Sequence, residues 1–121
     1  MPRILIVDDN DFDRNLLHTT LSSLGYDVIG TASNGREGIE KFLELKPDLV
    51  MTDLIMPEMN GIETLREIKS HDPDAKVMIC STADQEAMIS LAKRNGARGY
   101  IVKPYQTESL LTAVKKVVGE P

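Results

Sequence analysis

Five short apolar segments alternate with five segments of helical periodicity along the 121 residues of the chain. The apolar segments have the length of buried strands, and the helical segments carry apolar residues at helical spacing. This alternation predicts a parallel sheet with right-handed crossovers and with helices on both faces, a doubly wound α/β domain spanning residues 1–121. The expected strands are 4–7, 27–31, a run that begins after Pro47 and ends at Asp53, 76–81 and 100–102.

Capping residues and the spacing of apolar residues indicate where the five helices lie. Asp11 is predicted to cap the first helix, and residues 34–37 and 60–63 resemble capping boxes that begin the second and third. The predicted apolar faces are Phe12, Leu16, Leu17, Leu21 and Leu24; Ile39, Phe42 and Leu43; Ile62, Leu65 and Ile68; Ala87, Met88, Leu91 and Ala92; and Leu110, Leu111, Val114, Val117 and Val118.

Acidic residues stand where two of the predicted strands end. Asp8 and Asp9 follow the first strand, and Asp53 ends the third. Ligands bind at the carboxyl edge of open parallel sheets, although each acid taken alone could equally cap a helix or begin a turn. The pattern does not define the strand order. If the order is the flavodoxin-like 2-1-3-4-5, the first and third strands are neighbours and the three carboxylates meet.

Three neighbouring carboxylates repel one another, and without a cation the pKa of at least one of them would rise. Mg²⁺ prefers oxygen ligands and often uses one or two carboxylates together with a phosphate oxygen. A transition-metal site is not expected, because His18 and His71 lie in or near helices, away from this edge, and have no partner at ligand spacing. The acids therefore predict a Mg²⁺ site.

A hydroxyl group and an ammonium group end the fourth and fifth strands. Ser81 closes the fourth, and Lys103 follows the fifth, immediately before Pro104. A metal ion, a lysine and a hydroxyl donor around an aspartate can hold a phosphoryl group and neutralise the charge that develops during its transfer. Ser81 alone could be a turn residue and Lys103 a solvated charge, but placement after four separate strands favours a shared site.

These residues resemble the receiver domain of two-component response regulators, most of all the small stand-alone chemotaxis type. The resemblance covers essentially the whole chain. It rests on Val7-Asp8-Asp9, on residues 53–57 with Asn60-Gly61 after them, on Ser81, on Gly96-Ala97 and on residues 100–104.

The resemblance implies that Asp53 accepts a phosphoryl group from a histidine kinase and that the chain catalyses only its own phosphorylation and dephosphorylation. Asp9 would bind Mg²⁺ directly and Asp8 largely through water, and the backbone carbonyl of Ile55 would complete the metal site. Ile55 and Ala83 stand near the phosphoryl position where the family often has polar side chains.

The same resemblance implies a switch. Lys103 would contact the phosphoryl group, Ser81 would turn to hydrogen-bond it, Tyr100 would follow inward, and the Lys103–Pro104 peptide bond would be cis. The output face would be made by the fourth helix, the fifth strand and the fifth helix, and its basic character suits an acidic protein or peptide, such as a component of the flagellar motor. Its expected residues are Lys93, Arg94, Arg98, Tyr100, Lys115 and Lys116.

Composition limits the other classes of function. The net charge of −5 argues against direct nucleic-acid binding, although residues 76–121 are locally basic. With no apolar run as long as a membrane span and no signal peptide, a cytoplasmic protein is expected. The single Cys80 lies in an apolar run and is expected to be a buried thiol. Residues 96–99 lack the acidic pair common in receivers that dimerise, which favours a monomer.

Three alternatives follow from the same residues. The chain could be the receiver portion of a longer regulator with a separate output domain. A phosphatase with an aspartyl nucleophile would need a second acid two residues after Asp53, where Ile55 stands. A nucleotide or flavin carrier would need a Gly-rich or Ser/Thr-rich loop after the first strand, but the acidic run Asp8–Asp11 repels phosphate.

Overall fold

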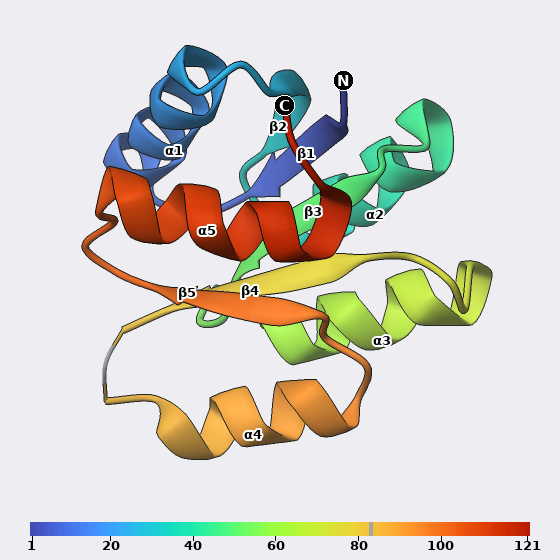
Figure 1. Cartoon of the computed structure of the whole chain (residues 1–121). Helices are drawn as coiled ribbons and strands as arrows, with labels where there is room; N and C mark the ends of the chain where they lie inside the picture. Colours follow the sequence, from blue (N-terminus) through green and yellow to red (C-terminus); the bar gives the residue numbers. More distant parts are fainter. Residues whose placement is uncertain (83) are drawn as a thin grey trace.

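The five apolar segments form one parallel sheet in the order β2-β1-β3-β4-β5, which confirms the doubly wound, flavodoxin-like arrangement (Figure 1). The computed structural model describes residues 1–82 and 84–121. Its strands are β1 (Arg3–Val7), β2 (Asp27–Ala32), β3 (Leu49–Asp53), β4 (Val77–Ser81) and β5 (Gly99–Val102). Its helices are α1 (Asp11–Ser23), α2 (Gly35–Leu45), α3 (Gly61–His71), α4 (Glu86–Arg94) and α5 (Thr107–Val118).

Two layers of helices enclose the sheet, with α1 and α5 on one face and α2, α3 and α4 on the other (Figure 1). Successive side chains of a strand point to opposite faces, so β1 contributes to both cores. Ile4 and Ile6 belong to the apolar cluster with α1 and α5, while Leu5 and Val7 belong to the cluster with the other three helices. None of the helices in the described part of the chain combines the length and apolar content needed for a bilayer span.

The strand register brings the polar residues at the strand ends together. β1 and β3 pair so that Asp8, the residue after β1, lies beside Asp53. Ser81 ends β4 opposite Val102, and Lys103 is the next residue of the chain. The carboxyl edge of the sheet therefore carries Asp8, Asp53, Ser81 and Lys103 side by side.

The first helix begins with a different cap from the predicted one. Asn10, not Asp11, is the N-cap of α1, and its side-chain oxygen accepts a hydrogen bond from the backbone N–H of Asp13 at 2.9 Å. Asp11 is instead the first helical residue, where an acid is favoured by the helix dipole. Asn and Asp are equally good caps, so the sequence pattern does not distinguish these adjacent positions.

The two predicted capping boxes differ in the structure. At α3, Asn60 and Glu63 form the complete box, as predicted. At α2, Asn34 accepts a hydrogen bond from the N–H of Glu37, but the Glu37 carboxylate accepts one from Ser33 instead of Asn34. The prediction that Asn34 caps α2 is therefore confirmed, but the predicted return hydrogen bond from the Asn34 N–H to Glu37 is not formed.

Several apolar residues predicted to line the helix faces lie at the surface. Phe12 is 73 % exposed, Leu16 39 % and Leu43 46 %. In α4, Ala87 is exposed and Ile89, which was not predicted, is buried. In α1 and α2 the stripe that meets the sheet is narrower than the apolar arc of the sequence, so residues at the edge of the arc remain in solvent.

Gly61 permits the β3–α3 loop to fold back against the end of β3. Its N–H donates a hydrogen bond to the Leu54 carbonyl at 2.8 Å. A Cβ atom at this position would lie 2.3 Å from the backbone carbonyl oxygen of Asp53, well inside van der Waals contact. Only glycine fits this close approach without moving the backbone that carries Asp53.

Candidate functional site

Three carboxylates from the ends of β1 and β3 form one acidic cluster. Asp8, Asp9 and Asp53 each offer an oxygen, and these atoms lie within 4.8 Å of one another. Asp8 is only 2 % exposed, Asp53 is partly buried and Asp9 is exposed. The structure therefore brings together the three acids that the sequence analysis placed at this edge.

The environment of Asp53 disfavours the charged form of its carboxyl group. Burial raises the pKa of Asp53 to about 6, and the negative charge of Asp8 adds to the rise. Two groups lower the pKa of Asp53 and so offset part of this rise. They are the ammonium group of Lys103 and the backbone N–H of Leu54, which donates a 3.0 Å hydrogen bond to Asp53 Oδ1. A further positive charge at this cluster would relieve the remaining repulsion.

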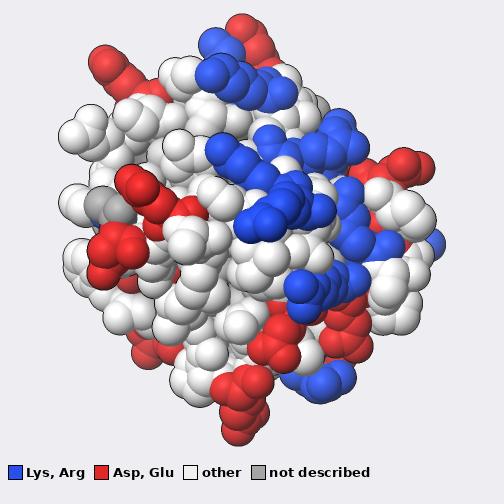
Figure 2. Space-filling model, turned by 90° about the horizontal axis from the view of Figure 1, so that it is seen from below, with Lys and Arg blue, Asp and Glu red and all other residues white. Residues whose placement is uncertain are grey.

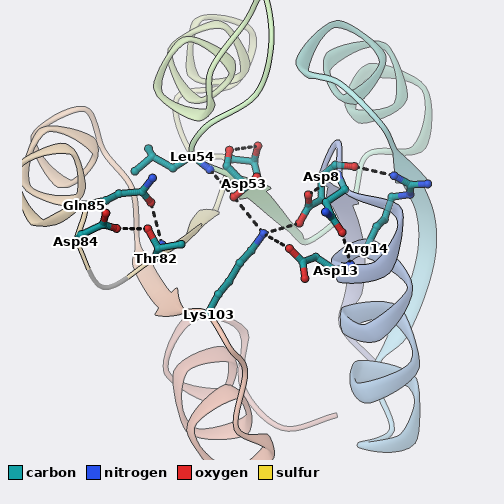
Figure 3. Close-up of polar contacts among 11 residues, drawn as sticks. Asp8, Asp13, Arg14, Asp53, Leu54, Thr82, Asp84, Gln85 and Lys103 are labelled. Carbon is teal, nitrogen blue, oxygen red and sulfur yellow. Dashed lines mark hydrogen bonds and ion pairs between the residues drawn. The ribbon is translucent and has the colours of Figure 1, made fainter.

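Lys103 supplies the cation that is present in the site. Its Nζ lies 3.0 Å from Asp8 Oδ2, 2.9 Å from Asp13 Oδ2 and 3.3 Å from Asp53 Oδ1 (Figure 3). Burial alone would lower the pKa of Lys103, but the hydrogen bonds to Asp13 and Asp8 and the charge of Asp53 raise it overall. The ammonium group therefore remains charged at neutral pH. The Lys103–Pro104 peptide bond is cis, as the family resemblance implied.

Asp13 is the member of this arrangement that the sequence analysis missed. It lies in the first turn of α1, where an acid is ordinary because it complements the helix dipole. The available signal was its position five residues after Asp8, at the start of the helix that leaves the carboxyl edge.

Backbone and side-chain contacts hold the loop after β1 in place. Asp8 Oδ1 accepts a hydrogen bond from the N–H of Asn10 at 2.9 Å. The Arg14 guanidinium donates to the backbone carbonyl of Asp8 at 2.8 Å and also pairs with Asp11. These contacts fix one oxygen of Asp8 and leave the other toward Lys103.

Ser81 lies at the end of β4 with its hydroxyl buried. Among the described residues its Oγ has no hydrogen-bond partner. The next residue, Thr82, donates two hydrogen bonds. Its hydroxyl donates to the Asp84 carboxylate, and its backbone N–H donates to Gln85 Oε1 at 2.8 Å (Figure 3). Ala83, singled out in the sequence, lies outside the described residues.

The donor set of the acidic cluster fits a hard divalent cation. All three side-chain donors are carboxylate oxygens, and the two histidines, His18 and His71, are exposed on helices. Hard cations such as Mg²⁺ take oxygen ligands, whereas the softer transition metals favour nitrogen and sulfur. The cluster could therefore bind a metal ion of the oxygen-seeking class.

The single cysteine is buried behind this edge, as predicted. Burial raises the pKa of the Cys80 thiol to about 12. The thiol therefore stays protonated at neutral pH.

A groove of about 940 Å³ runs along β5 between its flanking helices. The expected output residues Lys93, Arg98, Tyr100 and Lys116 line it, while Arg94 and Lys115 are exposed but do not. Lys93 Nζ lies 4.7 Å from the centre of the Tyr100 ring, and Tyr100 is 42 % exposed. Figure 2, a view from the side on which α4 lies, shows Lys and Arg side chains gathered over one part of the surface.

Residues 4–115 match the response regulator receiver domain family. The chemotaxis protein CheY of Thermotoga maritima is 49 % identical over 115 residues, which cover 95 % of this chain and 96 % of the relative. CheY of Bacillus subtilis is 43 % identical over 116 residues, covering 96 % and 97 % of the two chains.

Solved structures of receiver-domain proteins have the same fold as this chain. A receiver domain protein from Clostridium thermocellum superposes with a TM-score of 0.91 at 32 % identity, covering 98 % of this chain and 94 % of the other. CheY in a CheX–CheY–BeF₃–Mg²⁺ complex from Borrelia burgdorferi also gives 0.91, at 33 % identity and with coverage of 96 % and 88 %. The chain therefore belongs to the response regulator receiver domain family, is similar to CheY over almost its entire length, and is a protein of two-component signalling.

Proposed function

We propose that Asp53 is the phosphoacceptor of this receiver domain and that a histidine kinase is its phosphodonor. The observation that carries this proposal is the placement of the Asp53 carboxylate, in the acidic cluster and 3.3 Å from the Lys103 ammonium. In the transfer, an Asp53 oxygen forms a bond to phosphorus while the phosphorus–nitrogen bond of the phosphohistidine breaks. The imidazole keeps the electron pair of that bond. The chain would catalyse only its own phosphorylation and dephosphorylation.

Asp8, Asp9 and Asp53, together with the backbone carbonyl of Ile55, would hold a Mg²⁺ ion. When bound, this ion supplies positive charge that offsets the charge of the carboxylates and of the entering phosphoryl oxygens. Lys103 adds a second positive charge at a fixed position. Stabilisation of this kind is the main contribution that a protein makes to phosphoryl transfer.

The buried hydroxyl of Ser81 supports a switch at this site. Phosphorylation adds about −1.5 to −2 charges and new acceptor oxygens. Ser81, whose hydroxyl is without a partner among the described residues, would donate to one of these oxygens. The loop after β4 would move with it, and the exposed Tyr100 ring would turn inward, which alters the groove beside β5.

The altered groove would regulate a protein partner. Lys93, Arg98 and Lys116 give its lining a positive charge that suits an acidic protein or peptide. Because the relatives are chemotaxis proteins and one structure holds CheY with CheX, the flagellar motor or a CheX-like protein is the partner class that we propose. We further propose a cytoplasmic monomer that binds no nucleic acid.

Intact-mass spectrometry after incubation with acetyl phosphate tests the phosphoacceptor. We expect the chain to gain one phosphoryl group in the presence of Mg²⁺, and to gain none without Mg²⁺ or in the Asp53→Asn variant. The same substitution at the exposed Asp27 is the control and should leave the gain unchanged. A folded, Mg²⁺-binding wild-type chain that gains no mass would overturn the proposal.

A further inference from the structure

Asp13 lies closer to the Lys103 ammonium than the proposed phosphoacceptor does. The Nζ to Oδ distance is 2.9 Å for Asp13, 3.0 Å for Asp8 and 3.3 Å for Asp53 (Figure 3). A lysine ammonium has three N–H donors, and these three carboxylates provide one acceptor group for each. The Lys103 side chain is 14 % exposed and that of Asp13 is 30 % exposed, so their contact is partly shielded from water.

Asp13 stands apart from the acids of the proposed metal site. Among the residues that the structure describes, the acidic cluster comprises Asp8, Asp9 and Asp53, and Asp13 is not a member. Asp13 is held by α1 itself, since its backbone N–H donates to the Asn10 cap at 2.9 Å. Of the three carboxylates that contact Lys103, Asp13 alone has no proposed part in binding the metal ion or in accepting a phosphoryl group.

We propose that Asp13 is a positioning residue for phosphoryl transfer, which keeps the Lys103 ammonium at the site while Asp8 and Asp53 change partners. This inference rests on the proposed function. A divalent cation beside Asp8 would repel the ammonium. During phosphorylation one Asp53 oxygen becomes bonded to phosphorus, so the partner of the ammonium at Asp53 changes from a carboxylate to a phosphoryl group. Lysine has a long flexible stem, so without a fixed partner its charge would turn toward water. Asp13 supplies that fixed partner.

The sign of the effect separates positioning from simple charge. Acetyl phosphate is an anion, so removing a negative charge near the site would by itself accelerate its reaction. Loss of a positioning contact would slow the reaction instead. Asp11 is a matched control, because it is an acid in the same first turn of α1 but pairs with Arg14.

The hold on Lys103 can be measured without metal or phosphodonor. In the metal-free protein we would follow the acetylation of Lys103 by an N-hydroxysuccinimide ester, using peptide mass spectrometry. We expect Asp13→Ala to be labelled several-fold faster than the wild type, Asp13→Asn to be intermediate, and Asp11→Ala to match the wild type. Equal labelling of Lys103 in all four proteins would overturn the inference. Circular dichroism establishes that each variant is folded.

The phosphorylation rate at saturating Mg²⁺, measured by intact mass, tests the functional consequence. We expect Asp13→Ala to react roughly 3- to 10-fold more slowly than the wild type, Asp13→Glu to recover part of the rate, and Asp11→Ala to be unchanged or faster. In a Lys103→Ala background, Asp13→Ala should cause no further loss, because its effect acts through the lysine.

The outcomes distinguish the two proposals. If the wild type gains a phosphoryl group and Asp13→Ala reacts as fast or faster, the inference about Asp13 is wrong and the proposed function stands. An equal slowing by Asp13→Ala with and without Lys103 also rejects a role through the lysine. A wild type that gains no phosphoryl group removes the proposed function, and the positioning role with it.

Discussion

At the scale of single residues, the site is a balance between crowded negative charge and one partly buried cation, the Lys103 ammonium. Burial and Asp8 raise the pKa of Asp53 to about 6, and Lys103 opposes the rise. The charged form of Asp53 therefore costs folding free energy at neutral pH, which a bound cation would recover. The unfavourable negative charge thus favours the binding of a cation at this cluster.

Asp53→Asn should stabilise the metal-free protein at pH 7 by on the order of 2–3 kcal/mol. The Asp53 carboxyl ionises near its ordinary pKa of 3.8 in the unfolded chain but near 6 in the folded one. Between these pH values the unfolded state binds fewer protons, so wild-type stability falls as pH rises and stays lower above pH 6. The stability of the Asp53→Asn variant should not fall in this way. Urea unfolding of both proteins from pH 4 to pH 8 measures the free energy of unfolding. A variant less stable than the wild type at pH 7 would contradict the expectation.

Ser81→Ala should weaken the response of Tyr100 to phosphorylation while leaving the stability of the fold almost unchanged. Because the buried hydroxyl has no partner among the described residues, its removal should change the free energy of unfolding by less than about 1 kcal/mol. After phosphorylation, however, the Tyr100 ring should show a smaller NMR chemical-shift change than in the wild type. A loss of more than about 2 kcal/mol would mean that the hydroxyl makes a stabilising hydrogen bond in the folded protein.

Most site residues could be predicted because polar groups that end buried strands are conspicuous. Asp8, Asp53, Ser81 and Lys103 all occur at such positions. Asp13 was missed, because an acid in the first turn of a helix has an ordinary explanation and its position after Asp8 is only a weak signal. Its contact with Lys103 joins two segments 90 residues apart and depends on how α1 lies over the sheet.

At the scale of elements, local signals located the strands and helices better than they identified buried faces. Hydrogen bonds between near neighbours define a cap, so the box at Asn60 was visible in the sequence. Exposure depends on the angle at which a helix meets the sheet, so Phe12 and Leu43 were wrongly placed in the core. The prediction that Asp11 caps α1 was wrong by one position, because the neighbouring Asn10 is an equally good capping residue.

Gly61→Ala should destabilise the fold by about 1–3 kcal/mol or more, because its Cβ would meet the Asp53 carbonyl at 2.3 Å. The strain falls on the backbone that carries Asp53, the proposed phosphoacceptor, so the phosphorylation rate should fall as well. Gly99→Ala is the control, since a Cβ there would make only ordinary contacts at 3.5 Å. Thermal unfolding of both variants checks this, and equal midpoints would show that the β3–α3 loop can shift freely.

At the scale of the whole molecule, the strand order places α1 and the ends of β1, β3, β4 and β5 around one site. Alternation of strands and helices is local information and was sufficient for the fold class. The order was not, because many arrangements of five parallel strands allow right-handed crossovers. The order decides which strand ends become neighbours, so the acidic cluster is a property of the complete sheet.

Because the acidic cluster exists only in the folded sheet, Mg²⁺ should stabilise the entire domain. A ligand that binds only the folded state at 100 times its Kd contributes about 2.7 kcal/mol. For a domain of this size that corresponds to a rise in Tm of about 10 °C. The rise should shrink as pH falls below about 6, because protonation of Asp53 competes with the cation.

Asp9 offers the cleanest variant for this measurement, since it is an exposed member of the cluster. Asp9→Asn should fold normally and lose most of the Mg²⁺-induced rise in Tm, whereas Asp11→Asn, which removes the same charge two residues away, should retain it. Differential scanning calorimetry with and without Mg²⁺ gives both values. If Asp9→Asn and wild type rise equally, the stabilising ions act on the general negative charge of the protein, and the cluster at the end of β1 and β3 is not the metal site.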